Sequence, residues 1–258
     1  MSIEERFSVD GTTAIVTGAS SGIGKAIAET FAADGADVVV CSREQGNVDP
    51  VADAINDRDG GRCLAVECDV TDAGAVGALV DATVEEFGGL DCLVNNAGAS
   101  FMAPVEDVSE NGWKTIVDIN LHGAYHCVRA AADHLADGGG TVINVASVAG
   151  QRAAPYMSHY GAAKAGLENF TKTLAVEWAG RDVRANCLAP GYVATPGVES
   201  QMGVSAENVE RSEVDRRIGT SQEIADVARF LAADASSYLT GQTVTAEGVP
   251  PGEELPEA

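Results

Sequence analysis

The 258-residue sequence predicts an α/β fold in which a parallel β-sheet lies between layers of helices. Short β-branched runs alternate with helix-length amphipathic segments, which is the pattern of parallel strands joined by helical crossovers. Several runs are apolar throughout, as in Val38-Val39-Val40, and so fit strands that are buried on both faces. The chain is 45% apolar and has no linker-like break in composition, so we expect one domain over residues 1–258.

The sheet is expected to have about seven strands, and the first is the β-branched run Thr12–Val16. A helix with apolar spacing over Ile23–Phe31 follows it after a glycine-rich turn. The other expected strands are Asp37–Cys41, Arg62–Glu67, Asp91–Asn95, Thr141–Ala146, Val183–Leu188 and Gln242–Ala246. Two long amphipathic helices are expected at about 112–136 and 158–179.

The turn between the first strand and the first helix reads Thr17-Gly18-Ala19-Ser20-Ser21-Gly22-Ile23-Gly24. Glycine permits positive φ and close approach of a pyrophosphate, and a helix N-terminus offers unpaired amide donors and a positive dipole end. The segment is therefore a phosphate cradle in outline. Its spacing, Gly-x-x-x-Gly-x-Gly, differs from the usual G-x-G-x-x-G dinucleotide fingerprint, so alone it is a weak sign.

Tyr160 and Lys164 lie four residues apart in a helical segment, so they share one helix face. A phenol has a pKa near ~10, and lowering that pKa by roughly 3 units requires about 4 kcal/mol of stabilisation of the phenolate. An ammonium about 4 Å away, at an effective dielectric of about 20, supplies an energy of that order. Tyr160 is thus a candidate general acid/base, although two exposed residues on an alanine-rich helix give the same pattern.

Five motifs in chain order resemble those of the short-chain dehydrogenase/reductase family. They are the glycine-rich turn, Asn95-Asn96-Ala97-Gly98, Ser147, Tyr160-x-x-x-Lys164 and Pro190-Gly191. The resemblance runs from Gly11 to about Gly248. It implies a doubly wound Rossmann-type three-layer sandwich, and an NAD(P)-dependent oxidoreductase that acts on CH–OH and C=O groups.

The resemblance also implies four catalytic residues. Ser147 would orient and polarise the substrate carbonyl, and Tyr160 would donate or accept the proton. Lys164 would lower the pKa of Tyr160 and bind the nicotinamide ribose. Asn120 matches the asparagine that supports a proton-relay water, although an Asn in a helical stretch also marks a local kink or cap.

Cofactor contacts follow from the same resemblance. Asp69 would accept from the exocyclic amine of adenine, or simply form a turn. Asn95 to Gly98 would let the nicotinamide ribose pass, or its asparagines would simply brace the sheet. Pro190 to Thr195 would hold the carboxamide. The full expected set is Gly18, Ser20, Ser21, Gly22, Ile23, Gly24, Ser42, Arg43, Asp69, Val70, Asn96, Ala97, Gly98, Tyr160, Lys164, Pro190, Gly191, Val193 and Thr195.

The end of the second expected strand indicates which cofactor is preferred. An NAD site typically has a carboxylate there for the ribose 2′-hydroxyl, and this chain has none before Glu44. Ser42 offers a hydroxyl, and Arg43 offers a guanidinium that suits a 2′-phosphate. We expect NADP(H) to be preferred, with NAD(H) possible, unless Arg43 points to solvent.

The substrate is less well defined by the sequence. Residues 192–218 would cover the pocket, and Val148, Gln151, Pro155, Tyr156 and Met157 form a moderately apolar rim whose one fixed charge is Arg152. This favours a 3-oxoacyl thioester or a similar hydrophobic ketone. Arg211, Arg216 and Arg217 would meet a coenzyme A or carrier phosphate, or pair on the surface with Glu207, Glu210 and Glu213.

Other functions stay open at this point. They are a 2,4-dienoyl-CoA reductase-like enzyme, a polyol or sugar dehydrogenase, and a non-catalytic cofactor-binding sensor. The intact Ser147, Tyr160 and Lys164 argue against the first and the last. The family resemblance also suggests a homotetramer in which the two long helices pair across subunits, unless their apolar faces are ordinary core stripes.

The net charge of −23, from 39 acidic and 16 basic residues, would repel nucleic acid and anionic membranes. It is spread along the chain, and we hypothesise a halophilic cytosol. No apolar run of about 18 residues and no signal-like segment occurs, so a cytoplasmic enzyme is expected. The six scattered cysteines are expected to be buried thiols, and His122 and His126 share a helix face without a third ligand, so no metal site is expected.

Overall fold

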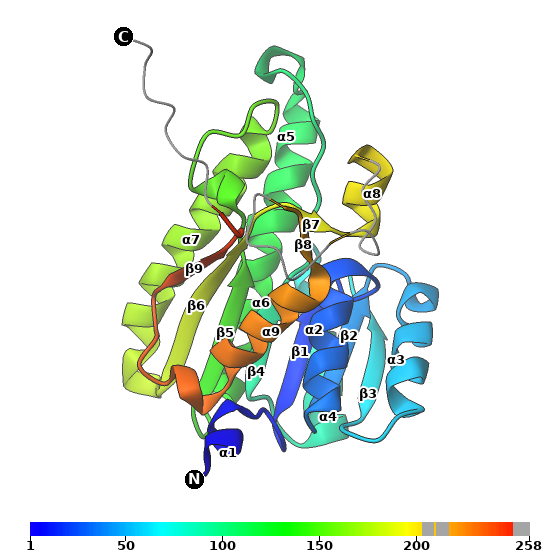
Figure 1. Ribbon diagram of the computed structural model, residues 1–258, viewed down its shortest axis with the longest axis vertical. Coiled ribbons are helices and arrows are strands. Elements are labelled where there is room, and N and C mark those ends of the chain that lie inside the picture. The colour runs from blue at the N-terminus through cyan, green and yellow to red at the C-terminus, as the bar shows by residue number, and fades with distance from the viewer. Residues whose placement is uncertain (203–208, 210–216, 250–258) are drawn as a thin grey trace.

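A computed structural model of the chain describes residues 1–202, 209 and 217–249. Its centre is a seven-stranded sheet in which every neighbouring pair is parallel, with the order β3-β2-β1-β4-β5-β6-β9 (Figure 1). The strands are β1 Thr13–Thr17, β2 Asp37–Ser42, β3 Cys63–Glu67, β4 Cys92–Asn95, β5 Gly140–Val145, β6 Val183–Pro190 and β9 Thr243–Ala246. The predicted doubly wound fold is confirmed, and each expected strand is present with its ends shifted by at most two residues.

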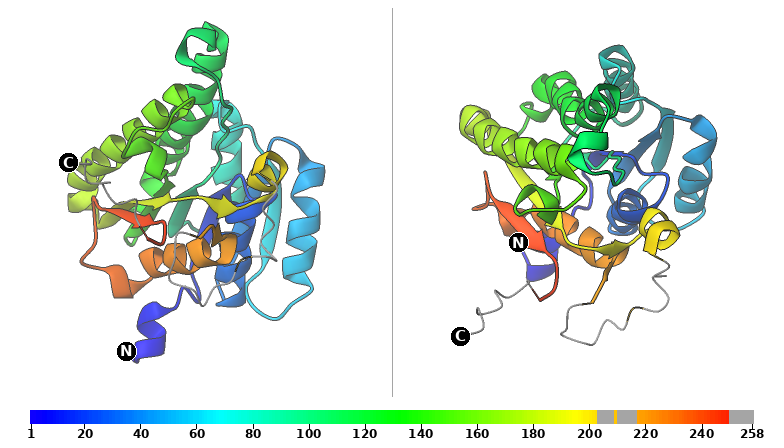
Figure 2. Two further views of the ribbon diagram at one scale, coloured as in Figure 1. Left: turned by 45° about the horizontal axis from the view of Figure 1, so that its top comes forward. Right: turned by 90° about the horizontal axis from the view of Figure 1, so that it is seen from above.

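Helices cover both faces of this sheet, as the view from above in Figure 2 shows. One face carries α2 Gly22–Ala33, α3 Asp49–Asn56 and α9 Ser221–Ala232, and the apolar side chains of these helices share one buried cluster with β1 and β2. The other face carries α4 Ala73–Phe87, α6 Gly123–Leu135 and α7 Ser158–Trp178, which form a second cluster. The sheet therefore has a hydrophobic core on each side, as strands that are buried on both faces require.

Shorter elements complete the described part of the chain. They are α1 Ile3–Phe7, α5 Glu110–Val117, α8 Pro196–Met202, and a small parallel sheet of β7 Val193–Ala194 and β8 Gly219–Thr220, together with several single helical turns. The helix expected at 112–136 is interrupted, because a π-helical turn, Asp118–His122, separates α5 from α6. Single π turns inside α-helices occur frequently at functional sites, and this one contains Asn120.

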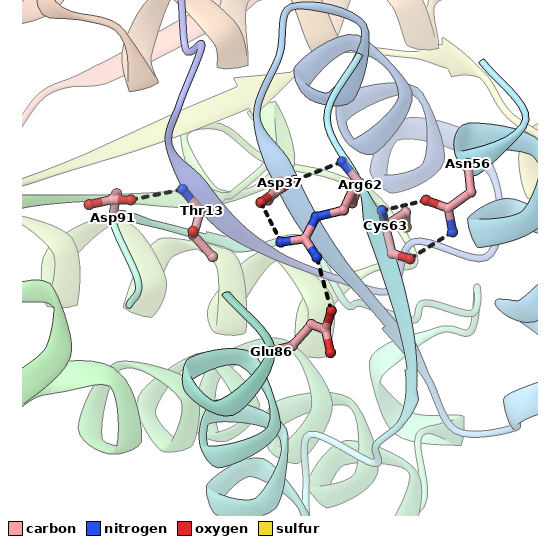
Figure 3. A network of polar contacts seen from close by, with 7 residues as sticks. All are labelled: Thr13, Asp37, Asn56, Arg62, Cys63, Glu86 and Asp91. Atoms are coloured by element: carbon pink, nitrogen blue, oxygen red, sulfur yellow. Dashed lines mark hydrogen bonds and ion pairs between the residues drawn. The ribbon is translucent and has the colours of Figure 1, made fainter. Parts of the chain in front are cut away.

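Polar side chains join the amino ends of neighbouring strands to each other and to α4 (Figure 3). The Asp91 carboxylate accepts from the Thr13 amide at 2.8 Å, which joins the start of β1 to the residue before β4. The Arg62 guanidinium pairs with Asp37 and with Glu86, each at 3.2 Å, and so ties β2 to α4. These contacts fix the register of the strands, and the carboxyl edge is left free for the loops of the site.

None of the helices in the described ranges has the length and apolar character that a membrane crossing needs. All six cysteines are free and buried, as expected. Arg217, for which a phosphate contact or a surface ion pair was expected, pairs with Glu223 in the first turn of α9 at 2.6 Å. The other basic and acidic residues named above in that segment lie outside the described residues.

Candidate active site

A cavity of about 600 Å³ lies at the carboxyl edge of the sheet. The loops after β1 and β4 both line it, and these adjacent strands mark the point where the strand order reverses. Ligands of open α/β sheets bind in the crevice at this point. Every predicted site residue except Gly24 and Asn120 lines the cavity. The lining also includes residues that the sequence reasoning missed, namely Glu44, Asn47, Cys68, Ala99, Ser100, Ile119, Val145, Ala146, Pro196, Gly197 and Val198.

The glycine-rich turn has the backbone conformation that a phosphate cradle needs. Gly18 and Gly22 have φ values of 64° and 57°, which side chains rarely tolerate. A Cβ at Gly18 would lie 2.7 Å from the Ala97 Cα, so the loops after β1 and β4 touch backbone to backbone. Ser21 is the N-cap of α2 but makes no side-chain capping bond, so its hydroxyl remains available to a ligand.

Gly24 has a different role from the one predicted. It does not line the cavity, and a Cβ there would collide with the Gly18 carbonyl and the Asn96 side chain. The Asn96 Nδ2 donates to the carbonyls of Thr17 and Gly18 at 2.9 and 3.0 Å. Gly24 therefore lets α2 approach the turn, and Asn96 braces the turn against β4, which is the alternative that the sequence left open for the asparagines.

Residues that follow β2 and β3 line the part of the cavity where the sequence predicts the adenosine of a dinucleotide. Arg43 is exposed there, and the Ser42 hydroxyl donates to the Glu44 carbonyl at 2.8 Å. Asp69 accepts from the Thr71 amide and hydroxyl through one oxygen, Oδ1, at 2.9 and 2.8 Å. Asp69 is thus a turn-forming residue that also lines the cavity, and its contact with adenine stays a prediction.

Ser147, Tyr160 and Lys164 line the opposite end of the cavity. The first turns of α7 present Tyr160 and Lys164 on one face, and the Lys164 Nζ lies 5.6 Å from the centroid of the Tyr160 ring. Lys164 is 3% exposed, and its Nζ donates to the Val145 carbonyl at 2.7 Å. Burial lowers the pKa of Lys164 to about 8.

The pKa of Tyr160 differs from the expectation that the ammonium would lower it. Burial raises this pKa, and a hydrogen bond with the Ser147 side chain opposes the rise. The Lys164 ammonium donates to the carbonyl at the end of β5 instead of to the phenol oxygen. Burial of the phenol disfavours the charged phenolate and therefore raises the pKa of Tyr160. Tyr160 therefore holds its proton at neutral pH.

Asn120 lies just outside the cavity wall and is 1% exposed. Its Nδ2 donates to the carbonyls of Ala99 and Ile116 at 2.8 and 2.9 Å, and its Oδ1 has no partner in the described structure. A Cβ at Gly98 would lie 2.8 Å from this oxygen and 3.6 Å from the Lys164 Nζ. The unpaired acceptor thus faces the same small space as the lysine, which suits an ordered water.

His159 is a buried feature beside the site that sequence reasoning did not single out as functional. Its ring lies against Phe101, with centroids 4.1 Å apart, and neither ring nitrogen has a hydrogen-bond partner in the described residues. Burial lowers its pKa, so the imidazole is neutral at pH 7. The sequence feature that could have drawn attention to His159 is its position immediately before Tyr160.

The last strand holds the loop that carries Ser147. The Thr245 hydroxyl bonds to the Gln151 side chain at 3.1 Å, and Arg152 pairs with Glu247 at 2.7 Å. The one fixed positive charge on the expected substrate rim is therefore neutralised. We call these two contacts the C-terminal clamp. Of the expected covering segment 192–218, β7, α8 and β8 are described, and residues 203–208 and 210–216 lie outside the described part.

The chain is similar to known proteins over most of its length. A family model described as enoyl-(acyl carrier protein) reductase matches residues 18–248. The chain is 40% identical to cis-4-hydroxycyclohexanecarboxylate dehydrogenase of Sinomonas cyclohexanicum, over 91% of this chain and 94% of that protein. It is 39% identical to a 3-oxoacyl-[acyl-carrier-protein] reductase of Synechocystis sp., over 91% and 95%.

A solved structure of similar architecture carries a cofactor. It is a proposed NAD(P)-dependent gluconate 5-dehydrogenase from Beutenbergia cavernae with NADP bound at low occupancy. The TM-score is 0.85 at 35% identity, and the match covers 94% of this chain and 98% of that one.

Proposed function

Because this chain belongs to the short-chain dehydrogenase/reductase family, we propose that it uses NADPH to reduce a ketone, such as a 3-oxoacyl thioester, to a secondary alcohol. The observation that carries the proposal is the single cavity that joins the glycine-rich turn and Arg43 to Ser147, Tyr160 and Lys164. A dinucleotide needs the first group of residues, and proton transfer to a carbonyl oxygen needs the second.

The residues present fit a nicotinamide dinucleotide. The turn at Gly18 and Gly22 brings backbone amides close to the cavity without side chains in the way, which suits a pyrophosphate. Arg43 would hold a 2′-phosphate, and Pro190, Gly191 and Thr195 would hold the carboxamide. When bound, the cofactor supplies the hydride.

The proton chemistry is assigned to the chain's own residues. The raised pKa of Tyr160 keeps its hydroxyl protonated at neutral pH, as a general acid that delivers a proton to a carbonyl oxygen must be. The Ser147 hydroxyl would orient the same oxygen. Lys164, with a pKa of about 8, is mostly an ammonium at pH 7, and it would replenish the Tyr160 proton through a water beside Asn120 Oδ1.

The substrate class has two candidates. A 3-oxoacyl thioester is supported by the Synechocystis relative, and an alicyclic secondary alcohol or its ketone is supported by the Sinomonas relative. The pairing of Arg152 with Glu247 leaves an uncharged rim, which suits a hydrophobic ketone in either case. A sugar or polyol is favoured less, because it needs several polar partners.

The test is consumption of NADPH and of NADH in molar KCl with acetoacetyl-CoA, a dienoyl-CoA, a cyclic ketone and a simple ketone. Tyr160→Phe is expected to lower kcat by about 10²–10⁴-fold, because it removes the transferable proton. Tyr238→Phe is the matched control, since Tyr238 is fully exposed. NADPH binding without turnover of any substrate would instead support a cofactor-binding sensor.

The assembly remains a proposal as well. A homotetramer is supported by the exposed apolar side chains of α5, α6 and α7, where Trp113, Tyr125 and Val176 are 40%, 44% and 80% exposed. Light scattering of the purified enzyme in molar KCl distinguishes a tetramer from a monomer.

A further inference from the structure

Two buried thiols lie beneath the adenosine end of the cavity. Cys41 is in β2, one residue before Ser42, and Cys68 follows β3, one residue before Asp69. Cys68 lines the cavity, while Cys41 is fully buried behind it. The proposed dinucleotide site uses the residues next to these thiols but neither thiol itself.

The register of the sheet brings the two sulfurs together. Cys41 pairs with Val66 across the parallel strands, and Cys68 is two residues beyond Val66, so both side chains point to the same face. Both belong to the core cluster on the α4 and α6 face. Each thiol acts on the pKa of the other, since Cys68 raises the pKa of Cys41 and Cys41 lowers the pKa of Cys68.

This contact distinguishes Cys68 from the other cysteines. It lowers the pKa of the Cys68 thiol, against the opposing effects of burial and of the Asp69 and Asp72 carboxylates. In contrast, burial raises the pKa of Cys63 and of Cys127 to about 12. Cys68 is thus the thiol that most readily forms the nucleophilic thiolate, and it is the one that lines the cavity.

We propose that Cys41 and Cys68 are an oxidisable dithiol, which a peroxide entering the empty cofactor cavity converts to a disulfide. The Cys68 thiolate attacks one oxygen of hydrogen peroxide, the O–O bond breaks, and the departing hydroxide takes up a proton to form water. The Cys41 sulfur then attacks the sulfenic acid, an S–S bond forms, and the hydroxyl leaves with the Cys41 proton as a second water. Two thiols lose two electrons in total, and the peroxide gains them.

Disulfide formation would change the cofactor site. Neighbouring strands lie roughly 4.8 Å apart and two residues along a strand span roughly 6.6 Å, so the Cα atoms of diagonal positions are roughly 8 Å apart. A disulfide usually needs about 4.4–6.8 Å between its Cα atoms, so the strand ends must move closer. The Cys41 carbonyl accepts from the Ala19 amide at 3.2 Å, and the Cys68 amide donates to the Ser42 carbonyl at 2.7 Å. Because of these hydrogen bonds, a movement of the Cys41 and Cys68 backbone would also displace the glycine-rich turn, Ser42 and the adjacent Asp69. This effect on affinity rests on the proposed function, whereas disulfide formation does not.

Peptide mass spectrometry tests the dithiol without reference to activity. Cleavage after glutamate places each of the six cysteines in a separate peptide, with Cys41 in residues 30–44 and Cys68 in residues 68–85. After hydrogen peroxide treatment of the cofactor-free protein, we expect these two peptides joined, with the loss of two hydrogen atoms. Excess NADPH should slow the reaction. In Cys41→Ser, Cys68 should stop at a sulfenic acid that dimedone traps.

Fluorescence titration with NADPH tests the consequence. The oxidised wild type should bind NADPH about tenfold more weakly, which corresponds to about 1.4 kcal/mol, and dithiothreitol should restore the affinity. Cys63→Ser is the matched control, because Cys63 is a buried cysteine of β3, the strand that precedes Cys68, but belongs to the cluster on the other face, and it should behave as the wild type. A Cys68–Cys127 disulfide, or an unmodified Cys68, would overturn the dithiol. If the disulfide forms but NADPH affinity is unchanged, the dithiol stands and its link to the cofactor site is overturned.

Discussion

Arg43 is the residue on which the proposed cofactor preference depends. It is exposed at the adenosine end of the cavity, where a guanidinium can hold a phosphate with two parallel hydrogen bonds. Arg43→Ala should raise KM for NADPH by about tenfold or more and leave KM for NADH nearly unchanged, because only NADPH carries the 2′-phosphate. Steady-state kinetics with both cofactors measure this.

Arg58→Ala is the control for the loss of one positive charge from an acidic protein. Arg58 is exposed, lies outside the cavity lining and forms a long ion pair of 3.9 Å with Glu29. It should change neither KM. If Arg43→Ala alters both cofactors equally, or neither, Arg43 points to solvent and the preference has another origin.

At the residue scale, the motifs predicted which side chains gather at the cavity, because most of them follow strands of a sheet whose topology was predictable, and Tyr160 and Lys164 lie in the first turns of α7. Gly24 does not line the cavity with the other predicted glycines, since the sequence cannot distinguish a glycine that admits a ligand from one that admits a neighbouring helix. Asn120 lies behind the wall rather than in it. The contact of Cys41 with Cys68 depends on strand register, which no local pattern shows.

At the element scale, the N-terminus of α9 carries a prediction about acid stability. Thr220 and Glu223 form a capping box, and Arg217 adds a bond of 2.6 Å to Glu223. The Arg217 guanidinium lowers the pKa of Glu223 from the ordinary 4.5 to about 2. Glu223 therefore takes up its proton at a higher pH in the unfolded chain than in the folded protein. The stabilisation of the folded state by ionised Glu223 is complete above about pH 4.5 and is lost as pH falls toward 2.

Glu223→Gln should therefore lower the free energy of unfolding by about 1 kcal/mol at pH 7, with a difference from wild type that shrinks below pH 4.5. Urea unfolding at several pH values measures it. Glu177→Gln, on the exposed face of α7, removes the same charge and should show no such trend. A difference that stays constant with pH would assign the effect to packing alone.

Element boundaries were largely predictable, because alternation and apolar runs determine where strands lie. The π turn Asp118–His122 was not, since one extra residue in a helix leaves no clear mark on apolar periodicity. The one indication in the sequence is Asn120, because an asparagine in a helical stretch often marks a local kink or cap. The short β7 and β8 were also missed, because two-residue strands are below the length that a pattern can reveal.

For the whole molecule, we propose that the charge of −23 is an adaptation to molar salt. Such salt reduces the screening length to about 3 Å and weakens repulsion among the 39 acidic residues. The melting temperature should rise substantially from dilute buffer to about 2 M KCl. An uncharged osmolyte at equal osmolality should stabilise less, and equal melting temperatures in dilute buffer and in KCl would contradict the proposal.

The C-terminal clamp has a consequence for the order in which the site is completed during synthesis. During synthesis the glycine-rich turn and Asp69 leave the ribosome early, and Thr245 and Glu247 follow more than 170 residues after Asp69. Domains generally fold as their chain emerges, so the adenosine half can be assembled while the loop of Ser147 still lacks its partners. A nascent chain stalled before β9 would then be able to hold a nucleotide before it can carry out catalysis.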